Sequence, residues 1–180
     1  MSKGRNMLGV ISLIVALAGV TVGAFSFISM NNYINDRNSY VLPMARTYYD
    51  GSLYTIVSGS LEIFNYNQKS YDTHGAFNLT SDTYTIPEPG FYQVIAQYSI
   101  DARDGDIFMI QLFSNTNIVG STQCSSSVNT NTFGVALTGI FNFTTGDSLI
   151  IKLYQYNSGE VSRDIYNGEA YNFFAIAKIA

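Results

Sequence analysis

The chain has 180 residues, a formal net charge of −4, and 47% hydrophobic against only 12% charged residues. Lys and Arg number 9 and form no cluster, which excludes the phosphate contacts of a nucleic-acid-binding protein. The single cysteine, Cys124, excludes an internal disulfide, so packing must stabilise the fold.

Residues 7–30 (MLGVISLIVALAGVTVGAFSFISM) carry no charge and are apolar apart from Ser, Thr and Gly. A helix needs about 20 such residues to cross a bilayer, so we expect a transmembrane helix over 7–30. Lys3 and Arg5 precede it, and short basic flanks stay in the cytoplasm. We therefore expect a single-pass protein of the cell membrane, with residues 1–6 cytoplasmic and the C-terminal domain extracellular.

Two kinds of processing remain open for this N-terminal segment. Ala16-Leu17-Ala18 offers a small-residue site for cleavage of a secretory signal. A pilin-type leader would instead be cut after Gly4, and the apolar helix would then become the core of a filament.

The polar residues 31–52 contain Pro43, which breaks any helical pattern, and are expected to form a stalk. Residues 53–180 are expected to form one acidic domain. Beyond residue 30 the chain has 7 Lys and Arg against 13 Asp and Glu, a net charge of 7 − 13 = −6.

Short runs rich in Tyr, Phe, Ile, Val and Thr, separated by turn signals, predict an all-β sandwich. Pro89-Gly90, Asp104-Gly105, Gly146-Asp147 and Asn167-Gly168 place glycine where a turn needs positive φ. The expected strands are 53–58, 60–65, 75–78, 82–86, 90–101, 106–114, 117–124, 132–143, 148–156 and 170–180.

The last two strands are apolar on both faces, which predicts a subunit interface over the outward face. Leu149, Ile151 and Leu153 are assigned to the core. The residues then expected at the oligomer interface are Ile150, Tyr154, Tyr156, Phe174 and Ile176. The opposite register, which exchanges these residues with the odd-numbered set, remains open.

A series of short motifs runs through the domain in a fixed order. They are Asn65-Tyr66-Asn67, Tyr71-Asp72, Gly75-Ala76-Phe77, Pro87-Glu88-Pro89-Gly90-Phe91-Tyr92, Phe143-Thr144-Thr145-Gly146-Asp147 and Tyr171-Asn172-Phe173-Phe174-Ala175-Ile176. From about residue 53 to the C-terminus this order resembles the C1q branch of the C1q/TNF-like jelly-roll family. Ala175 stands where the family has glycine.

The resemblance implies a two-sheet antiparallel jelly roll that forms a homotrimer and recognises proteins or other surface ligands. Family members are often carried on a collagen stalk, but this sequence has no Gly-X-Y repeat. The resemblance implies that an N-terminal membrane helix tethers the domain in place of a collagen stalk, as in the TNF branch.

Residues with catalytic or metal-binding chemistry are few. His74 is the only histidine, and neither it nor Cys124 has a sequence partner for catalysis or zinc, so we expect no enzyme, metal or cofactor. Asp101, Asp104 and Asp106 surround Gly105 as a solvated hairpin turn, and calcium binding there is the alternative.

Asn78 and Asn142 begin glycosylation sequons on the expected extracellular side. The 14 Tyr and 12 Phe are assigned to the core and interface, with a glycan- or protein-binding surface as the alternative.

The sequence therefore predicts a membrane-anchored, extracellular, non-enzymatic recognition or assembly domain whose ligand is an unidentified surface protein or glycan. The alternative is a structural subunit of a cell-surface filament or coat, with a pilin-like helix and a β-sandwich head. The mature N-terminus distinguishes the two.

Overall fold

The computed structural model describes residues 41–180, apart from the side chain of Asn131. This part of the chain is all-β, as predicted. Its strands are β1 (Met44–Tyr48), β2 (Tyr54–Ile56), β3 (Leu61–Ile63), β4 (Gln68–Asp72), β5 (Phe77–Asn78), β6 (Thr83–Thr85), β7 (Gly90–Ala102), β8 (Ile107–Ser114), β9 (Asn117–Ser125), β10 (Thr130–Phe143), β11 (Ser148–Tyr156), β12 (Arg163–Ile165) and β13 (Phe173–Lys178).

The transmembrane helix expected at residues 7–30 lies outside the described residues. Within residues 41–180, no helix has the length and hydropathy that crossing a membrane requires.

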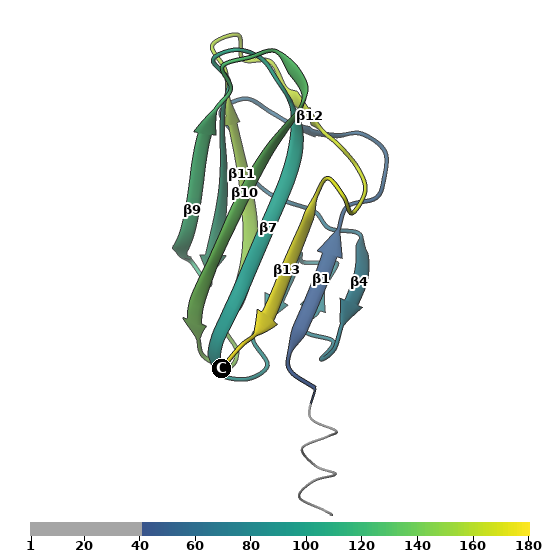
Figure 1. Ribbon diagram of the computed structural model, residues 1–180, viewed down its shortest axis with the longest axis vertical. Coiled ribbons are helices and arrows are strands. Elements are labelled where there is room, and N and C mark those ends of the chain that lie inside the picture. The colour runs from purple at the N-terminus through teal and green to yellow at the C-terminus, as the bar shows by residue number, and fades with distance from the viewer. Residues whose placement is uncertain (1–40) are drawn as a thin grey trace, which may run out of the picture. The chain divides into compact units, whose positions relative to one another are not determined.

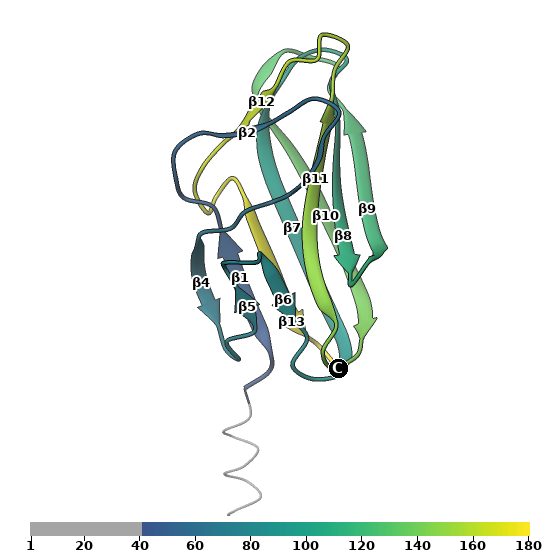
Figure 2. The same cartoon turned by 180° about the vertical axis from the view of Figure 1, so that it is seen from behind.

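The strands form two antiparallel sheets. In the first sheet the order is β2-β12-β7-β13-β1-β4, with β10 paired to β7, and in the second it is β5-β6-β11-β8-β9, with β3 paired to β11. Figure 1 shows the strands β10, β7, β13, β1 and β4 of the first sheet side by side. From behind, Figure 2 shows β11 of the second sheet in front of β7 and β10, with β8 and β9 next to it.

The 13-residue strand β7 connects most of the first sheet. It pairs with β10 along one edge, and with β13 and then β12 along the other. Tyr92, Val94 and Ile100 are fully buried, because alternate residues of a strand face the core.

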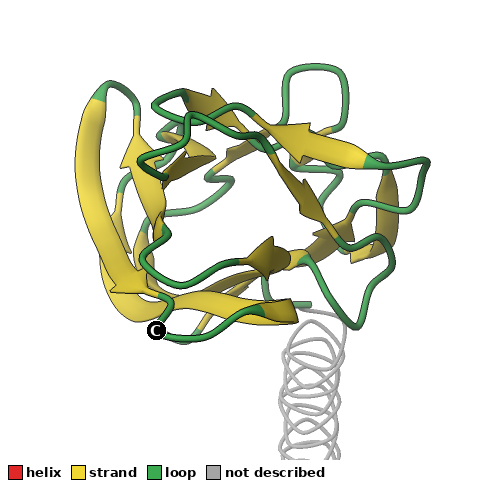
Figure 3. Cartoon of the chain, turned by 90° about the horizontal axis from the view of Figure 1, so that it is seen from above, coloured by secondary structure: helices red, strands yellow, loops and turns green. Residues whose placement is uncertain are grey.

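The core lies between the inner faces of the two sheets, which Figure 3 shows from above. An aromatic group fills the part beneath β13: Phe174 lies 5.9 Å from Phe77, 6.3 Å from Tyr66 and 6.2 Å from Tyr84 between ring centroids. Burying a side chain of this size contributes about 1.5–3 kcal/mol, so this cluster is a main source of stability in a domain without an internal disulfide.

The turns follow the predicted chemistry. Gly105, between β7 and β8, has a φ of 83°, and Gly146, between β10 and β11, has a φ of 90°. A residue with a Cβ atom is strained at such angles, so glycine at these positions sets the hairpin turns.

The predicted start of the domain is wrong. Residues 44–48 were assigned to the stalk, but they form β1, which lies between β13 and β4 inside the first sheet. Ala45 and Thr47 are buried, so this strand belongs to the domain, which begins at Leu42. Its two inward residues are a small one and a polar one, a pattern too weak to identify a strand from sequence.

Two further strands, β4 and β12, were not predicted. The side chains of β4 are almost all exposed, and β12 has three residues, so neither shows an apolar alternation. Strand pairing fixes the position of both: β4 pairs with β1, and β12 pairs with β2 and β7.

Candidate recognition and assembly surfaces

The outward residues of β11 lie where the sequence placed them. Leu149, Ile151 and Leu153 are buried in the core, which leaves Ile150, Tyr154 and Tyr156 on the outer face of the second sheet. Their role at an interface remains a prediction.

Phe174 and Ile176 do not point outward, which corrects the orientation expected for the closing strand. They are 2% and 1% exposed, because β13 pairs with β7 so that Phe174 lies opposite Ala96 and Ile176 opposite Val94. Directly paired residues share a side of the sheet, and Ala96 and Val94 face the core. For this strand the alternative, odd-numbered register is the correct one.

The outer face of the first sheet is formed by outward residues of β1, β7, β10 and β13, together with Ile179, and we call it the first-sheet face. Ile140, Phe91 and Ile179 are 61%, 49% and 48% exposed there. The other members are small, amide-bearing or apolar. They are Met44, Gln93, Ile95, Gln97, Ala136, Thr138, Asn142, Phe173, Ala175 and Ala177.

One charged group interrupts the first-sheet face. The Arg46 guanidinium lies 3.8 Å from the centre of the Phe173 ring, and its Nε donates to Glu169 Oε1 at 2.7 Å. The Ser70 hydroxyl also donates to Glu169 Oε1. The Ser70 hydrogen bond, together with Arg46, lowers the pKa of Glu169. The charge of Arg46 is therefore balanced within its own chain.

The outer face of the second sheet, which we call the second-sheet face, carries larger side chains. Ile150 is paired with Phe113, Tyr154 with Met109, and Tyr156 with Ile107. Lys152 lies among them with its Nζ 4.4 Å from the centre of the Phe113 ring.

The three aspartates of the β7–β8 turn do not converge. Asp106 is buried and accepts from Arg163 Nε at 2.6 Å, whereas Asp101 accepts from Arg103 Nη1 at 2.7 Å and Asp104 is exposed. Throughout residues 41–180, no three His, Cys, Asp or Glu residues are grouped to hold a metal ion. The hydrogen bonds of Asp106 give it a structural role in this turn.

The remaining candidate residues are dispersed. His74 is exposed, with its Nδ1 3.0 Å from the Thr73 hydroxyl, and Cys124 is a half-buried free thiol whose pKa is raised by burial. The sequon residues Asn78 and Asn142 are both exposed. Whether either carries a glycan remains a prediction.

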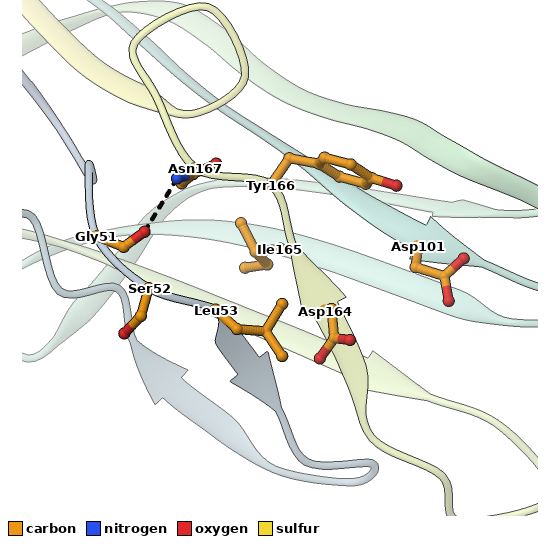
Figure 4. Close-up of a pocket in the computed structure, with 8 residues that line it drawn as sticks. All are labelled: Gly51, Ser52, Leu53, Asp101, Asp164, Ile165, Tyr166 and Asn167. Atoms are coloured by element: carbon orange, nitrogen blue, oxygen red, sulfur yellow. Dashed lines mark hydrogen bonds between the residues drawn. The ribbon is translucent and has the colours of Figure 1, made fainter.

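A cavity of about 480 Å³, which the sequence did not indicate, lies where β12 meets β7 and β2. Asn167 Nδ2 donates to the Gly51 carbonyl at 3.0 Å at one end of it, and Asp101 and Asp164 line the other (Figure 4). Its walls are Leu53, Ile165 and Tyr166, with Ser52 at the rim. These residues come from three separate segments, so no local motif could reveal the site.

Sequence comparison matches the chain to no family model and to no curated protein. Solved structures share its fold. The Eiger TNF of S. frugiperda is 12% identical with a TM-score of 0.55, covering 78% of this chain and 94% of that one. The globular domain of zebrafish complement 1qA is 15% identical with a TM-score of 0.53, covering 77% and 98%. Murine APRIL at pH 8.5 is 10% identical with a TM-score of 0.56, covering 77% and 100%. The domain therefore has the jelly-roll fold of TNF and C1q globular domains, which is the fold that the motifs indicated.

Proposed function

We propose that this protein is a single-pass, membrane-anchored extracellular domain, without enzymatic activity, that acts in surface recognition or assembly as a homotrimer. Three features support the proposal: the uncharged segment 7–30 after a basic flank, the jelly-roll fold shared with TNF and C1q domains, and a broad sheet face on which the charge of Arg46 is balanced by Glu169.

The observation that carries self-association is the composition of the first-sheet face. The pairing registers place Ile140 beside Gln93 and Ala177, and Thr138 beside Ile95 and Ala175, in rows that cross the sheet. Alanine side chains let another sheet approach closely. Removing an exposed Ile or Phe from water contributes about 1.5–3 kcal/mol, so a second copy laid over this face would gain stability from each.

A closed ring buries such a surface without open-ended growth, and the number three follows from the family resemblance. We therefore assign the interface to the first-sheet face, in place of Phe174 and Ile176. The second-sheet face, with Ile150, Tyr154 and Tyr156, stands as the alternative interface.

The absence of enzymatic activity is proposed from the distribution of reactive groups. Among the hydrogen bonds of the described residues, none joins His74 to Cys124, and Asp101 and Asp106 of the β7–β8 turn are held in separate ion pairs.

The mass of residues 31–180 in solution, measured by light scattering at micromolar concentration, tests self-association. We expect three times the mass of one chain. A well-folded monomer would contradict the proposal.

Proteolysis of intact cells tests the topology. We expect trypsin to release the domain by cleavage at Arg37, and to spare Arg46, which lies within β1 and pairs with Glu169. If the domain were digested only after lysis, it would lie on the cytoplasmic side, and the proposed recognition function would be wrong.

A further inference from the structure

Two aspartates on neighbouring strands, Asp101 and Asp164, line the cavity beside β12. The register sets Ile165 opposite Ile100, and both are buried in the core. One position further along, on the outward side, the same antiparallel register sets Asp164 opposite Asp101. Residues placed in this way have Cβ atoms about 4.5–5.5 Å apart, and like charges there destabilise the sheet.

Only one of the two carboxylates forms an ion pair with a cation of the chain. Arg103 Nη1 donates to Asp101 Oδ1 at 2.7 Å, whereas Asp164 Oδ1 accepts from the neutral Thr55 hydroxyl at 2.9 Å. The guanidinium of Arg163, the residue before Asp164, is hydrogen-bonded to Asp106, which raises the pKa of Arg163; Asp101 and Asp164 add smaller electrostatic contributions without an ion pair to it. Among the ion pairs of the described residues, none includes Asp164.

The cavity around these carboxylates is otherwise partly apolar. Leu53, Ile165 and Tyr166 line it, and Figure 4 shows Leu53 and Tyr166 on either side of Ile165. Its volume of about 480 Å³ falls in the range of small-molecule sites, which is roughly 300–1,000 Å³. Such a volume holds a short chain of carbon atoms, and not only an ion.

We propose that this cavity binds an aliphatic chain that ends in a cation. The cation lies between Asp101 and Asp164 and relieves their repulsion, while the chain lies along Leu53 and Tyr166. An alkylammonium group has this chemistry, whether as a free amine or as a lysine side chain of a partner. The inference gives the proposed recognition function a ligand class, and it does not depend on the trimer.

A divalent metal ion fits these observations less well. The site offers two carboxylates without a third acidic or imidazole ligand, and the Leu53 and Tyr166 walls would have no role around a small hydrated ion.

Ligand-observed NMR with the full chain in a nonionic detergent tests the proposal. The probes are cadaverine, N-acetyl-lysine methylamide, its uncharged counterpart N-acetyl-norleucine methylamide, and Ca²⁺. We expect both amines to bind, and the norleucine derivative to bind at least tenfold more weakly. Tighter binding of cadaverine would identify a free amine as the ligand, and tighter binding of the lysine derivative a protein side chain.

Asp164→Asn keeps an acceptor for Thr55 but removes the charge, and we expect it to weaken amine binding at least tenfold. Asp104→Asn is the matched control, because Asp104 is an exposed carboxylate of the nearby turn that does not line the cavity. If Asp164→Asn failed to fold, Leu53→Asn would serve, since Leu53 is 69% exposed and its loss removes an apolar wall.

Equal binding of the norleucine derivative, an unchanged Kd in these cavity variants, or displacement of the amines by Ca²⁺ would overturn the inference. Light scattering on the same samples reports the association state separately. A monomer that still binds the amines would contradict the trimer alone.

Discussion

The two outer faces of the sandwich both carry exposed apolar side chains, but the residues around those side chains differ. On the second-sheet face, Ile118, Leu61 and Tyr156 are 53%, 45% and 45% exposed, and their neighbours include the large half-buried residues Phe113 and Tyr154. On the first-sheet face, Ile140 is 61% exposed beside Gln93 and Ala177. Exposure of apolar residues alone therefore does not distinguish the two faces. The alanines of the first-sheet face, which let a second sheet approach closely, are the difference between them.

The largest expected effect separates the core from the first-sheet face within β13. Phe174→Ala removes a ring that is 2% exposed and should lower the free energy of unfolding by about 3–5 kcal/mol. Phe173→Ala removes the neighbouring, half-exposed ring on the outward side and should lower the free energy of unfolding by clearly less than Phe174→Ala does. Urea unfolding followed by circular dichroism measures both. Equal losses would show that the register of β13 is not the one described.

Charged substitutions compare the two faces directly. Ile140→Asp on the first-sheet face should convert the trimer to a monomer, because an unpaired carboxylate buried between subunits is strongly destabilising. Tyr154→Asp on the second-sheet face should leave the mass unchanged. Light scattering gives the masses, and the melting temperature checks that each variant folds. The reverse result would assign the interface to Ile150, Tyr154 and Tyr156.

Strands with one clear apolar alternation were predictable from the sequence. The strand expected at 90–101 is β7, where the apolar residues Tyr92, Val94 and Ile100 face the core, and glycine marks the turns at Gly105 and Gly146. The strand β1 was missed because its inward residues, Ala45 and Thr47, give no apolar period, and its place depends on pairing with β13.

The sites were less predictable, because they depend on which strands become neighbours. The odd-numbered and the even-numbered residues of β13 are both apolar, so the sequence does not show which set faces the core. The pairing of Phe174 with Ala96 and of Ile176 with Val94 decides that Phe174 and Ile176 are core residues. Likewise, Asp101 and Asp164 are 63 positions apart in the sequence, and the β7–β12 pairing brings them together.

Acid pH should affect the first-sheet face through Glu169. The Ser70 hydrogen bond and the Arg46 ion pair lower the pKa of Glu169. Their contribution to stability is therefore fully present above the ordinary pKa range of a glutamate, and it is lost as the pH falls through the lowered pKa of Glu169. Arg46 then leaves an unbalanced positive charge on the face, and we expect the trimer to dissociate. Light scattering from neutral to acid pH, with circular dichroism at each step, measures this. In Glu169→Gln the charge balance is already lost at neutral pH, so the same titration should show no further change from this group.

The smallest expected effect compares a cation–π contact on each face. Lys152 lies 4.4 Å from the Phe113 centroid and Arg46 lies 3.8 Å from that of Phe173. At surface sites such a contact contributes about 0.5–1 kcal/mol, so Lys152→Gln and Arg46→Gln should each lower the free energy of unfolding by about that amount. Arg46→Gln also removes the partner of Glu169 and leaves that carboxylate unbalanced on the first-sheet face. We therefore expect the two variants to differ little in urea unfolding of the separated chain but to differ in mass, with only Arg46→Gln weakening the trimer. Weakening by Lys152→Gln alone would place the interface on the second sheet.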